Sequence, residues 1–533
     1  MTGPLGPASM RRVRLAAIDV GSNSVHMVIA DVTAEGRIEV VDRVKEMVRL
    51  GRRTFTTGVL PQPAMELAVR AVKTFARLAR ARRVEQIRAV ATSAVREARN
   101  GAAFVRRLRR ESGLPVKVIP GAEEARLIFR AARHALGLEG GPQLLVDVGG
   151  GSVELVLVHE GRPLWLRSLP LGTARLTENF LHADPPGRRQ VERLEKHLDR
   201  EIGSLLAGAR HAGVVRAIGT SGTINTLVAM ARAVRGDDIG RLHGASASAA
   251  EIARVRRRVL AVPASRRVDL PGMDAKRVDL MPAAAVLVDF VLSRAGGPAL
   301  TACTWALREG VLLEMAGVPA GAEPSEDRLR SVEALAERFA GSNAHGRQVA
   351  RIALMLFDGT REVLQLPPSA RELLHHAALL HDIGHAIDHD RHHHHSCYLI
   401  RNAEIIPFAP SEVEIMAQVV RGHRKQIPKP SDPELRALPG PSRRIVRGLA
   451  GLLRLADALD RTQFGVVRRL TVTASPGRLV IDVDAGTENA ELELWAAERR
   501  TDLLTRLVER PVLIRERRDT AAAHPRMRAT GAS

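Results

Sequence analysis

Hydrophobic runs at the start of the chain are short and are joined by small polar residues. Residues 15–19 and 25–30 are two such runs, separated by Gly21-Ser-Asn-Ser24, which predicts two adjacent strands and a tight turn. The pattern returns at residues 144–147 and 153–158, which flank Gly149-Gly-Gly-Ser152. A repeated strand, turn and strand predicts two similar α/β lobes with a cleft between them.

The spacing of apolar residues elsewhere predicts helices as well as strands. Helices are expected at residues 63–83 and 101–110, and strands at 87–91 and 116–119. Beyond the Gly- and Pro-rich residues 317–325 the pattern is mostly helical to about residue 461. The last expected elements are strands at 470–473 and 479–483, a helix at 501–509 and a strand at 511–515.

These elements divide the chain into an α/β half and a largely helical half. We expect lobe I at residues 12–135, lobe II at 136–316, a linker at 317–326, a helical domain at 327–465, a small α/β subdomain at 466–516 and a disordered tail at 517–533.

The charge of the chain indicates the kind of partner. Its 533 residues include 80 Lys and Arg against 59 Asp and Glu, a net charge of +21, which attracts polyanions. Aromatic residues make up only 3%, which argues against a protein that stacks nucleic-acid bases. We therefore favour phosphate-rich ligands over a specific nucleic-acid partner. Whether the charge forms a substrate channel or reflects an Arg-rich composition stays open.

The compartment is predicted from what the sequence contains. Cys303 and Cys397 are too few for a disulfide framework and fit a reducing environment. No run reaches the ~20 apolar residues that span a bilayer, and the apolar run at residues 14–31 is interrupted by polar residues. We expect a cytoplasmic protein with no membrane partner.

Three Gly- and Ser-rich turns that follow predicted strands are suited to phosphate, because such turns expose backbone N–H groups. One such turn alone equally often does no more than join strands, but two of these have Asp at the same strand end. Asp147 and Glu154 are separated by a hairpin-like turn, so both carboxylates are expected to face one metal. The candidate phosphate-binding residues are Asp19, Gly21, Ser22, Asn23, Ser24, Gly149, Gly150, Gly151, Ser152, Gly219, Thr220, Ser221 and Gly222.

Together with Leu307-Arg-Glu-Gly-Val-Leu-Leu-Glu-Met315, these turns resemble the motifs of the exopolyphosphatase / guanosine pentaphosphate phosphohydrolase (Ppx/GppA) family. The resemblance runs from about residue 15 to 315 and, less sharply, through the C-terminal half. It implies two ribonuclease-H-like lobes of the actin, sugar-kinase and heat-shock ATPase superfamily that close over a phosphate chain. It also implies a homodimer.

The resemblance further implies catalytic residues. Ala91-Thr-Ser-Ala-Val-Arg96 matches the segment whose arginine contacts phosphate, and Gly121-Ala-Glu-Glu-Ala-Arg126 matches the segment whose catalytic glutamate falls on Glu124. Read without the family, Glu124 is an ordinary acid of a first helical turn, and Arg96 is a surface arginine. In the implied roles Glu124 orients the attacking water, Arg96 contacts phosphate oxygens, and Asp147 and Glu154 hold Mg²⁺, with Mn²⁺ as the alternative.

The helical half resembles the HD superfamily of metal-dependent phosphohydrolases. Its four characteristic positions are filled by His345, His381, Asp382 and Asp457, which implies a second divalent metal held between helices. The sequence leaves open whether this HD-like centre binds metal and whether it catalyses a reaction.

A run of further histidines follows the His-Asp pair. In a continuous helix His381, His385 and His389 would share one face and form a separate zinc site. If the helix ends near Asp390, the run His392 to His395 lies in a loop and contacts anionic substrate or has a structural role. We favour the second interpretation.

From these features we expect an exopolyphosphatase that removes terminal phosphate from inorganic polyphosphate, with Mg²⁺ in the interlobe cleft. Hydrolysis of guanosine pentaphosphate would use the same residues. A hypothesis of another class is a polyphosphate or alarmone sensor that does not turn its ligand over. A third hypothesis is a nucleotide phosphohydrolase activity in the HD-like centre.

Overall fold

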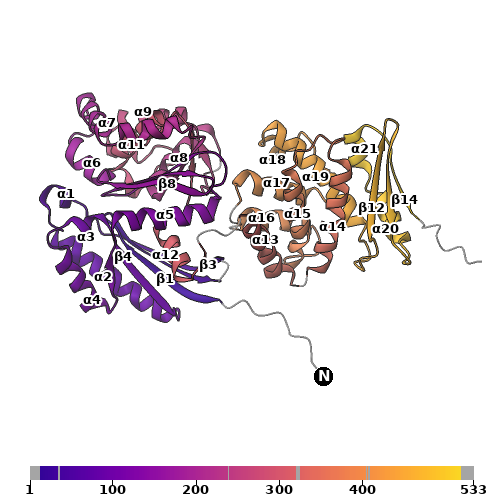
Figure 1. Cartoon of the computed structure of the whole chain (residues 1–533), viewed down its shortest axis with the longest axis horizontal. Coiled ribbons are helices and arrows are strands. Elements are labelled where there is room, and N and C mark those ends of the chain that lie inside the picture. Colours follow the sequence, from indigo (N-terminus) through magenta and orange to yellow (C-terminus); the bar gives the residue numbers. More distant parts are fainter. Residues whose placement is uncertain are drawn as a thin grey trace, which may run out of the picture. The chain divides into compact units, whose positions relative to one another are not determined.

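The computed structural model describes residues 12–33, 36–237, 239–319, 324–341, 343–403, 405, 408–425 and 427–517. The chain divides between Pro324 and Ser325 into two units, which Figure 1 shows in indigo to rose and in orange to yellow. Apart from Arg517, the tail predicted at residues 517–533 lies outside the described residues. No described helix combines the length and the hydropathy that a membrane-spanning segment needs.

The first repeat forms a five-stranded sheet in the order β3-β2-β1-β4-β5. The two predicted strands are β1 and β2, which pair antiparallel, and β1 also pairs in parallel with β4. Buried residues of α2 recur at positions 64, 68, 72 and 76, one stripe at helical spacing. The elements of this lobe are β1 (Val13–Val20), β2 (Ser24–Val32), β3 (Ile38–Met47), α1 (Thr54–Thr57), α2 (Gln62–Ala81), β4 (Gln86–Ala91), α3 (Ser93–Glu97), α4 (Gly101–Ser112) and β5 (Val116–Val118).

The second repeat forms a six-stranded sheet in the order β10-β11-β9-β6-β7-β8. Strand β6 is buried along its whole length, as expected for a central strand of an α/β sheet. The elements are β6 (Gln143–Val148), β7 (Val153–His159), β8 (Arg162–Leu169), α6 (Thr173–Phe180), α7 (Arg188–His211), β9 (Arg216–Thr220), α8 (Ser221–Arg235), β10 (Ser246–Ala247), α9 (Ala249–Ala261), α10 (Ala264–Arg267), the 3₁₀ turn η1 (Ala275–Arg277), α11 (Met281–Arg294) and β11 (Ala299–Ala302).

Two helices cross between the sheets and hold the lobes together. Helix α5 (Gly121–Leu136) packs against β7 and β8 of the second sheet, whereas α12 (Leu307–Met315) packs against β1 and β2 of the first. The two helices also pack against each other, and Figure 1 shows α5 running between the two sheets. Each lobe is thus completed by a helix from the other part of the sequence.

Gly310 lets these two helices approach closely. A Cβ atom built on Gly310 would overlap with the backbone carbonyl of Leu127 in α5, and a helical backbone cannot give way as a flexible side chain can. We therefore expect Gly310→Ala to lower the free energy of unfolding by about 1–3 kcal/mol, measured by urea denaturation of the full chain. Gly208→Ala on α7, where a Cβ meets nothing within 4 Å, is the control and should be neutral or slightly stabilising.

The second unit is a group of helices around one hydrophobic core. Helices α14, α15, α17 and α19 pack against one another and line this core with buried Leu, Ile and Val residues. The helical elements are α13 (Pro324–Ala340), α14 (Ala344–Thr360), α15 (Ala370–Leu380), the 3₁₀ turn η2 (Ile383–Ala386), α16 (His392–Asn402), α17 (Pro410–Arg421), α18 (Pro433–Arg436) and α19 (Gly440–Ala458).

A three-stranded sheet follows these helices, in the order β12-β13-β14. Strand β12 pairs antiparallel with β13, and β13 pairs in parallel with β14 after two short helices. Contacts of β12 with α14 join this sheet to the same core. The elements are β12 (Arg469–Ser475), β13 (Arg478–Asp484), α20 (Glu491–Glu498), α21 (Asp502–Val508) and β14 (Val512–Glu516).

Candidate active site

The predicted phosphate-binding turns of the two lobes face one cavity of about 310 Å³. The turns are built alike: the amide of Gly21 donates to the carbonyl of Ser24 at 3.1 Å, and that of Gly149 donates to Ser152 at 3.0 Å. Of the predicted residues, those that line the cavity are Asp19, Gly21, Ser22, Asn23, Ser24, Glu124, Asp147, Gly149, Gly150, Gly151, Ser152, Ser221 and Gly222.

The remaining predicted residues lie just behind the lining. Gly219 and Thr220 end β9, and the hydroxyl of Thr220 donates to the Asp147 carboxylate. Glu154 is 1% exposed and accepts a hydrogen bond from Ser168 Oγ at 2.7 Å. Strand register pairs Asp147 directly with Glu154, and residues opposite each other on paired strands project from the same face. The two acids therefore stand side by side, one at the cavity wall and one beneath it.

Glycine is required where the two lobes come closest. A Cβ atom on Gly151 would overlap with the ring of Phe55 and with Ser93 Oγ, both from the first lobe. A Cβ atom on Gly150 would lie 3.1 Å from Ser22 Cβ, also across the cleft. The Gly-rich turn of the second lobe thus packs with its bare backbone on the first lobe, where the amides of Gly150 and Gly151 remain available to a phosphate.

Glu124 lies in the first turn of α5 and is paired with Arg96. Nη1 of Arg96 donates to Glu124 Oε2 at 3.1 Å and to the carbonyl of Ile119 at 2.9 Å. Burial outweighs the charge and hydrogen bond of Arg96 and raises the pKa of Glu124 to about 8. A carboxyl whose pKa lies near neutrality is suited to exchange a proton with a reacting water.

Four carboxyl groups, those of Asp19, Glu124, Asp147 and Glu154, interact at the base of the cleft. Burial, followed by repulsion from Asp147, raises the pKa of Asp19 to about 6, although the Arg308 charge opposes it. Burial also raises the pKa of Asp147, and burial with the charges of Glu124 and Asp147 raises that of Glu154 well above its usual value. Buried acids that repel one another need a cation between them to be ionised together.

The oxygen atoms of this cluster fit a hard divalent cation. Asp19 Oδ1 and Glu154 Oε2 are both buried and accept no hydrogen bond among the described residues. Such atoms are costly to leave without a partner, and carboxylate oxygens are the ligands preferred by Mg²⁺ and Mn²⁺. Asp19, Asp147 and Glu154 are therefore the residues that would hold the metal.

The same acids predict how the stability of the metal-free protein depends on pH. The folded-state pKa values of Asp19 and Glu124, about 6 and about 8, exceed their ordinary values of 3.8 and 4.5. Between the ordinary and the raised pKa values the native state therefore binds more protons than the unfolded state, so the free energy of unfolding decreases as pH rises. In EDTA the melting temperature is expected to fall as pH rises through this range. Excess MgCl₂ should reverse the fall at the upper end, and an equal pH profile with and without Mg²⁺ would contradict the prediction.

Four basic residues that line the cavity were not predicted from the sequence. Strand register places Asp19, His26 and Lys45 in one row across β1, β2 and β3, while Arg277 and Arg308 come from η1 and α12. Burial and the Arg277 charge lower the pKa of Lys45 to about 8. Burial and the Arg308 charge lower that of His26 to about 2, so its ring is neutral.

Of these basic residues, Arg308 could have been found from the sequence. Arg308 belongs to the Leu307–Met315 motif already singled out, and its guanidinium contacts His26 Nδ1. Arg277, held by Asp274 at 3.1 Å and by Thr223 Oγ1 at 3.3 Å, lies in an irregular segment without a motif. His26 and Lys45 become visible only through the pairing of three strands.

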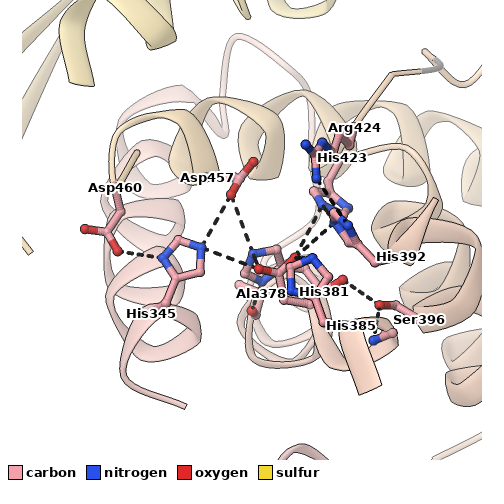
Figure 2. Close-up of polar contacts among 12 residues, drawn as sticks. His345, Ala378, His381, His385, His392, Ser396, His423, Arg424, Asp457 and Asp460 are labelled. Carbon is pink, nitrogen blue, oxygen red and sulfur yellow. Dashed lines mark hydrogen bonds and ion pairs between the residues drawn. The ribbon is translucent and has the colours of Figure 1, made fainter. Parts of the chain in front are cut away.

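In the second unit, the four predicted metal ligands converge. His345 Nε2 lies 3.7 Å from Asp382 Oδ2 and 3.5 Å from Asp457 Oδ1. His381 Nε2 lies 3.5 Å and 3.6 Å from the same two oxygens. Burial lowers the pKa of His345, but hydrogen bonds with Asp457 and Asp460 raise it to about 10 in the absence of metal. Figure 2 shows the rings of His345 and His381 with Asp457 between them.

For the histidine run, both the continuous helix and the favoured loop were wrong. Helix α15 ends at Leu380, and His392–Asn402 is a separate helix, α16, so the run does not lie in a loop. The cause is a contact from farther along the chain: Ser396 Oγ donates to the carbonyl of His381 at 2.7 Å and accepts from the amide of Gly384 at 2.8 Å. His392 thereby reaches the metal-ligand cluster, with Nε2 at 3.2 Å from Asp382 Oδ1.

Comparison with known proteins places this geometry in context. Residues 28–318 match the model of the Ppx/GppA phosphatase family, and residues 328–496 match that of Ppx/GppA phosphatase, domain III. A guanosine-5'-triphosphate,3'-diphosphate pyrophosphatase of Vibrio vulnificus is 29% identical over 499 residues, which cover 92% of this chain and 96% of the relative.

Solved structures resemble more than half of the chain. An exopolyphosphatase from Cytophaga hutchinsonii is 31% identical with a TM-score of 0.54, covering 58% of this chain and 100% of that one. A Ppx/GppA family member from Aquifex aeolicus is 30% identical with a TM-score of 0.50, covering 57% of this chain and 98% of its own. The expected lobes of the actin-type ATPase fold, followed by a helical region, are confirmed.

Proposed function

Because the chain belongs to the Ppx/GppA phosphatase family and is a phosphoanhydride hydrolase, we propose that its substrate is inorganic polyphosphate, from which it removes terminal phosphate. The observation that carries this choice is the lining of the cleft. It contains Lys45, Arg277 and Arg308 and phosphate-binding turns, while no Phe, Tyr or Trp lines it among the described residues. A cleft of this kind offers charge to a phosphate chain and, apart from the small imidazole of His26, no aromatic ring on which a base stacks.

The side chains divide the chemistry between them. Hydrolysis of a phosphoanhydride needs an oriented water and positive charge around the transferred group. Glu124 orients and deprotonates the water, and Arg96 holds the Glu124 carboxylate in place from behind, since Arg96 does not line the cavity. The amides of Gly150 and Gly151 hold phosphate oxygens. Mg²⁺ bound at Asp19, Asp147 and Glu154 would offset the charge of the leaving phosphate.

Guanosine pentaphosphate is the second candidate substrate, and a relative at 29% identity supports it, since the Vibrio vulnificus protein is named for hydrolysis of this compound. The two are separated by measuring phosphate release from long-chain polyphosphate and from guanosine pentaphosphate with the same preparation. We expect the higher kcat/KM on polyphosphate. Phosphate release from guanosine pentaphosphate but not from polyphosphate would overturn the proposal in favour of the second substrate. Binding of either compound without phosphate release would favour the hypothesis of a sensor that does not turn its ligand over.

The net charge of +21 predicts a salt effect that depends on chain length. A long polyphosphate reaches beyond the cleft and displaces counterions from basic surface that a short chain does not touch. Its affinity is therefore expected to fall more steeply with salt than that of tripolyphosphate, measured by competition for the same cleft. Equal slopes for both chains would mean that the surface charge outside the cleft is not used.

In the second unit we propose an HD-like domain at residues 327–465, with one divalent metal held by His345, His381, Asp382 and Asp457. Support comes from the distances of 3.5 to 3.7 Å between the histidine and aspartate ligand atoms, which are only slightly longer than the about 3.0–3.4 Å between two ligands of one ion at bond lengths of about 2.1 Å. Metal-stripped protein is expected to take up Mn²⁺ at this centre, and His345→Gln should abolish that uptake. Binding unchanged by His345→Gln would disprove the site.

Two further expectations stay predictions: the homodimer, which the family resemblance implies, and the cytoplasmic location, which was expected from the sequence. A homodimer is checked by sedimentation equilibrium of the full chain, in which a mass near 57.8 kDa would mean a monomer. A cytoplasmic location is checked by fractionation of the producing cell.

A further inference from the structure

A pocket in the second unit lies between α18, the first half of α19, the end of α21 and the turn that follows α14. Its volume is about 570 Å³, within the ~300–1,000 Å³ of small-molecule sites. Figure 1 shows α18, α19 and α21 near one another in this unit. The pocket shares no residue with the cleft of the first unit or with the histidine and aspartate cluster. We call it the arginine pocket, after Arg443, Arg444 and Arg447 in its lining.

The three arginines give this pocket an excess of positive charge. Arg443 and Arg447 are four residues apart on α19 and share one face of the helix. Arg444 Nη1 donates to Gln365 Oε1 at 3.0 Å. Among the described residues that line the pocket Glu509 is the only acid, and no described carboxylate forms an ion pair with any of the three guanidinium groups. The pocket is therefore suited to an anion.

Arg447 offers a hydrogen-bond donor to such a ligand. Its Nε atom is buried and has no hydrogen-bond partner in the part of the chain that the structure describes. A buried donor without an acceptor is costly, and the cost is larger for a charged group. The first turn of α19, which begins at the pocket with Gly440, contains no acid, so the helix dipole adds positive charge there. The oxygen atoms of a carboxylate or phosphate accept well from guanidinium groups.

Most of the remaining lining is aliphatic, which restricts the kind of anion. No described Phe, Tyr or Trp lines the pocket, so a nucleotide base finds no ring for stacking. An inorganic phosphate chain would set charge against the aliphatic side chains and beside Glu509. A purely apolar ligand would desolvate the guanidinium groups without giving them an acceptor. The aliphatic lining residues are Val363, Leu364, Pro430, Leu435, Leu507 and Val508.

We propose that the arginine pocket binds a small aliphatic anion, a carboxylate or a phosphate monoester with a hydrocarbon body. The head group pairs with Arg443 and Arg447, and the hydrocarbon lies against the Leu and Val side chains. Arg444, Gln365 and Glu509 are exposed and line the same pocket, so the ligand enters from solvent. Because no residue is shared with the cleft, this site does not depend on which substrate the cleft hydrolyses.

The ligand class is tested by isothermal titration calorimetry of the full chain with butanoate, hexanoate and octanoate. The affinity is expected to rise about 4-fold for each added CH₂ group that is buried. Octanamide has the same hydrocarbon body without the charge and should bind about 10-fold more weakly, or less. Octyl phosphate, compared with octanoate, shows which of the two head groups the pocket prefers.

The location is tested with arginine variants. Arg447→Gln is expected to lower the affinity for octanoate by about 10–100-fold, and Arg443→Gln should act in the same direction. Since Arg447 Nε has no acceptor, Arg447→Gln should leave the melting temperature unchanged or raised, which a structural role would not allow. Arg478→Gln, at an exposed position of β13, is the matched control and should bind octanoate as the unmodified protein does.

Three results would overturn the proposal. An affinity that does not depend on chain length would remove the hydrocarbon from the site. Inorganic phosphate or tripolyphosphate that binds as tightly as octyl phosphate, and is lost in Arg447→Gln, would mean a site for inorganic anions. Octanoate binding that is unchanged in both Arg443→Gln and Arg447→Gln would place the ligand elsewhere. If Arg447→Gln fails to fold, the result for Arg443→Gln decides.

Discussion

Glu124→Gln is expected to lower kcat for phosphate release by about 10²–10⁴-fold, the range of a general base, with little change in the affinity for polyphosphate. In the unmodified protein Arg96 Nη1 donates to Glu124 Oε2 at 3.1 Å. Glutamine keeps the size of the side chain and an oxygen that accepts this hydrogen bond, but it cannot take a proton from water. Because burial raises the pKa of Glu124 to about 8, loss of its ionisable group should leave the folded protein as stable as before or more stable.

The neighbouring acid supplies the control for this change. Glu123 accepts from Lys117 Nζ at 2.9 Å and does not line the cavity. Glu123→Gln should therefore retain nearly full activity. Rates are measured by continuous phosphate release and binding by fluorescence of labelled polyphosphate. A Glu124→Gln rate within a few-fold of the unmodified protein would mean that another group orients the water.

Asp147→Asn is the second change with a large expected effect. Asparagine still accepts from the Thr220 hydroxyl, but it removes the charge that would hold Mg²⁺ beside Asp19 and Glu154. Since metal assistance is worth several kcal/mol, kcat/KM should fall by about 10²–10³-fold and the Mg²⁺ concentration for half activity should rise. Meanwhile the metal-free protein should gain stability, because a buried acid with a raised pKa is removed.

This opposite response of activity and stability distinguishes a metal ligand from a structural acid. Asp199→Asn on α7, an exposed acid 2.8 Å from Arg294, is the charge-matched control and should alter neither quantity appreciably. Activity is followed across a MgCl₂ titration and stability by thermal unfolding in EDTA. A variant that loses stability in EDTA as well as activity would show that Asp147 holds the fold rather than the metal.

The cleft between the two lobes could be predicted from the sequence, because the turns that form it are set by short segments of the chain. The strands around Gly21 and Gly149 are short apolar runs with a tight turn between them, and the turn length alone sets Asp147 opposite Glu154. Arg277 and Lys45 could not be predicted as cleft residues. Arg277 lies in an irregular segment, and Lys45 reaches the cleft through a third strand. Pairing between distant segments has no signature in a single segment.

The histidine-rich segment shows the same limit in a helical region. Spacing of four residues suggested one helix through His381, His385 and His389, but helical spacing shows only what a helix would align and not whether the helix continues. The contact of Ser396 with the carbonyl of His381 ends it. The close approach of α16 to Gly384, where a Cβ would overlap with the carbonyl of His392, then brings that histidine into the cluster.

The crossing of α5 and α12 links the position of Glu124, the proposed general base, to the arrangement of the two lobes. Glu124 begins a helix packed on the second sheet, while its partner Arg96 follows β4 of the first sheet. A hinge rotation of one sheet against the other therefore changes the 3.1 Å separation of this ion pair. The Arg96–Glu124 pair therefore joins the two lobes directly at the proposed general base, and its geometry depends on the angle between the two sheets.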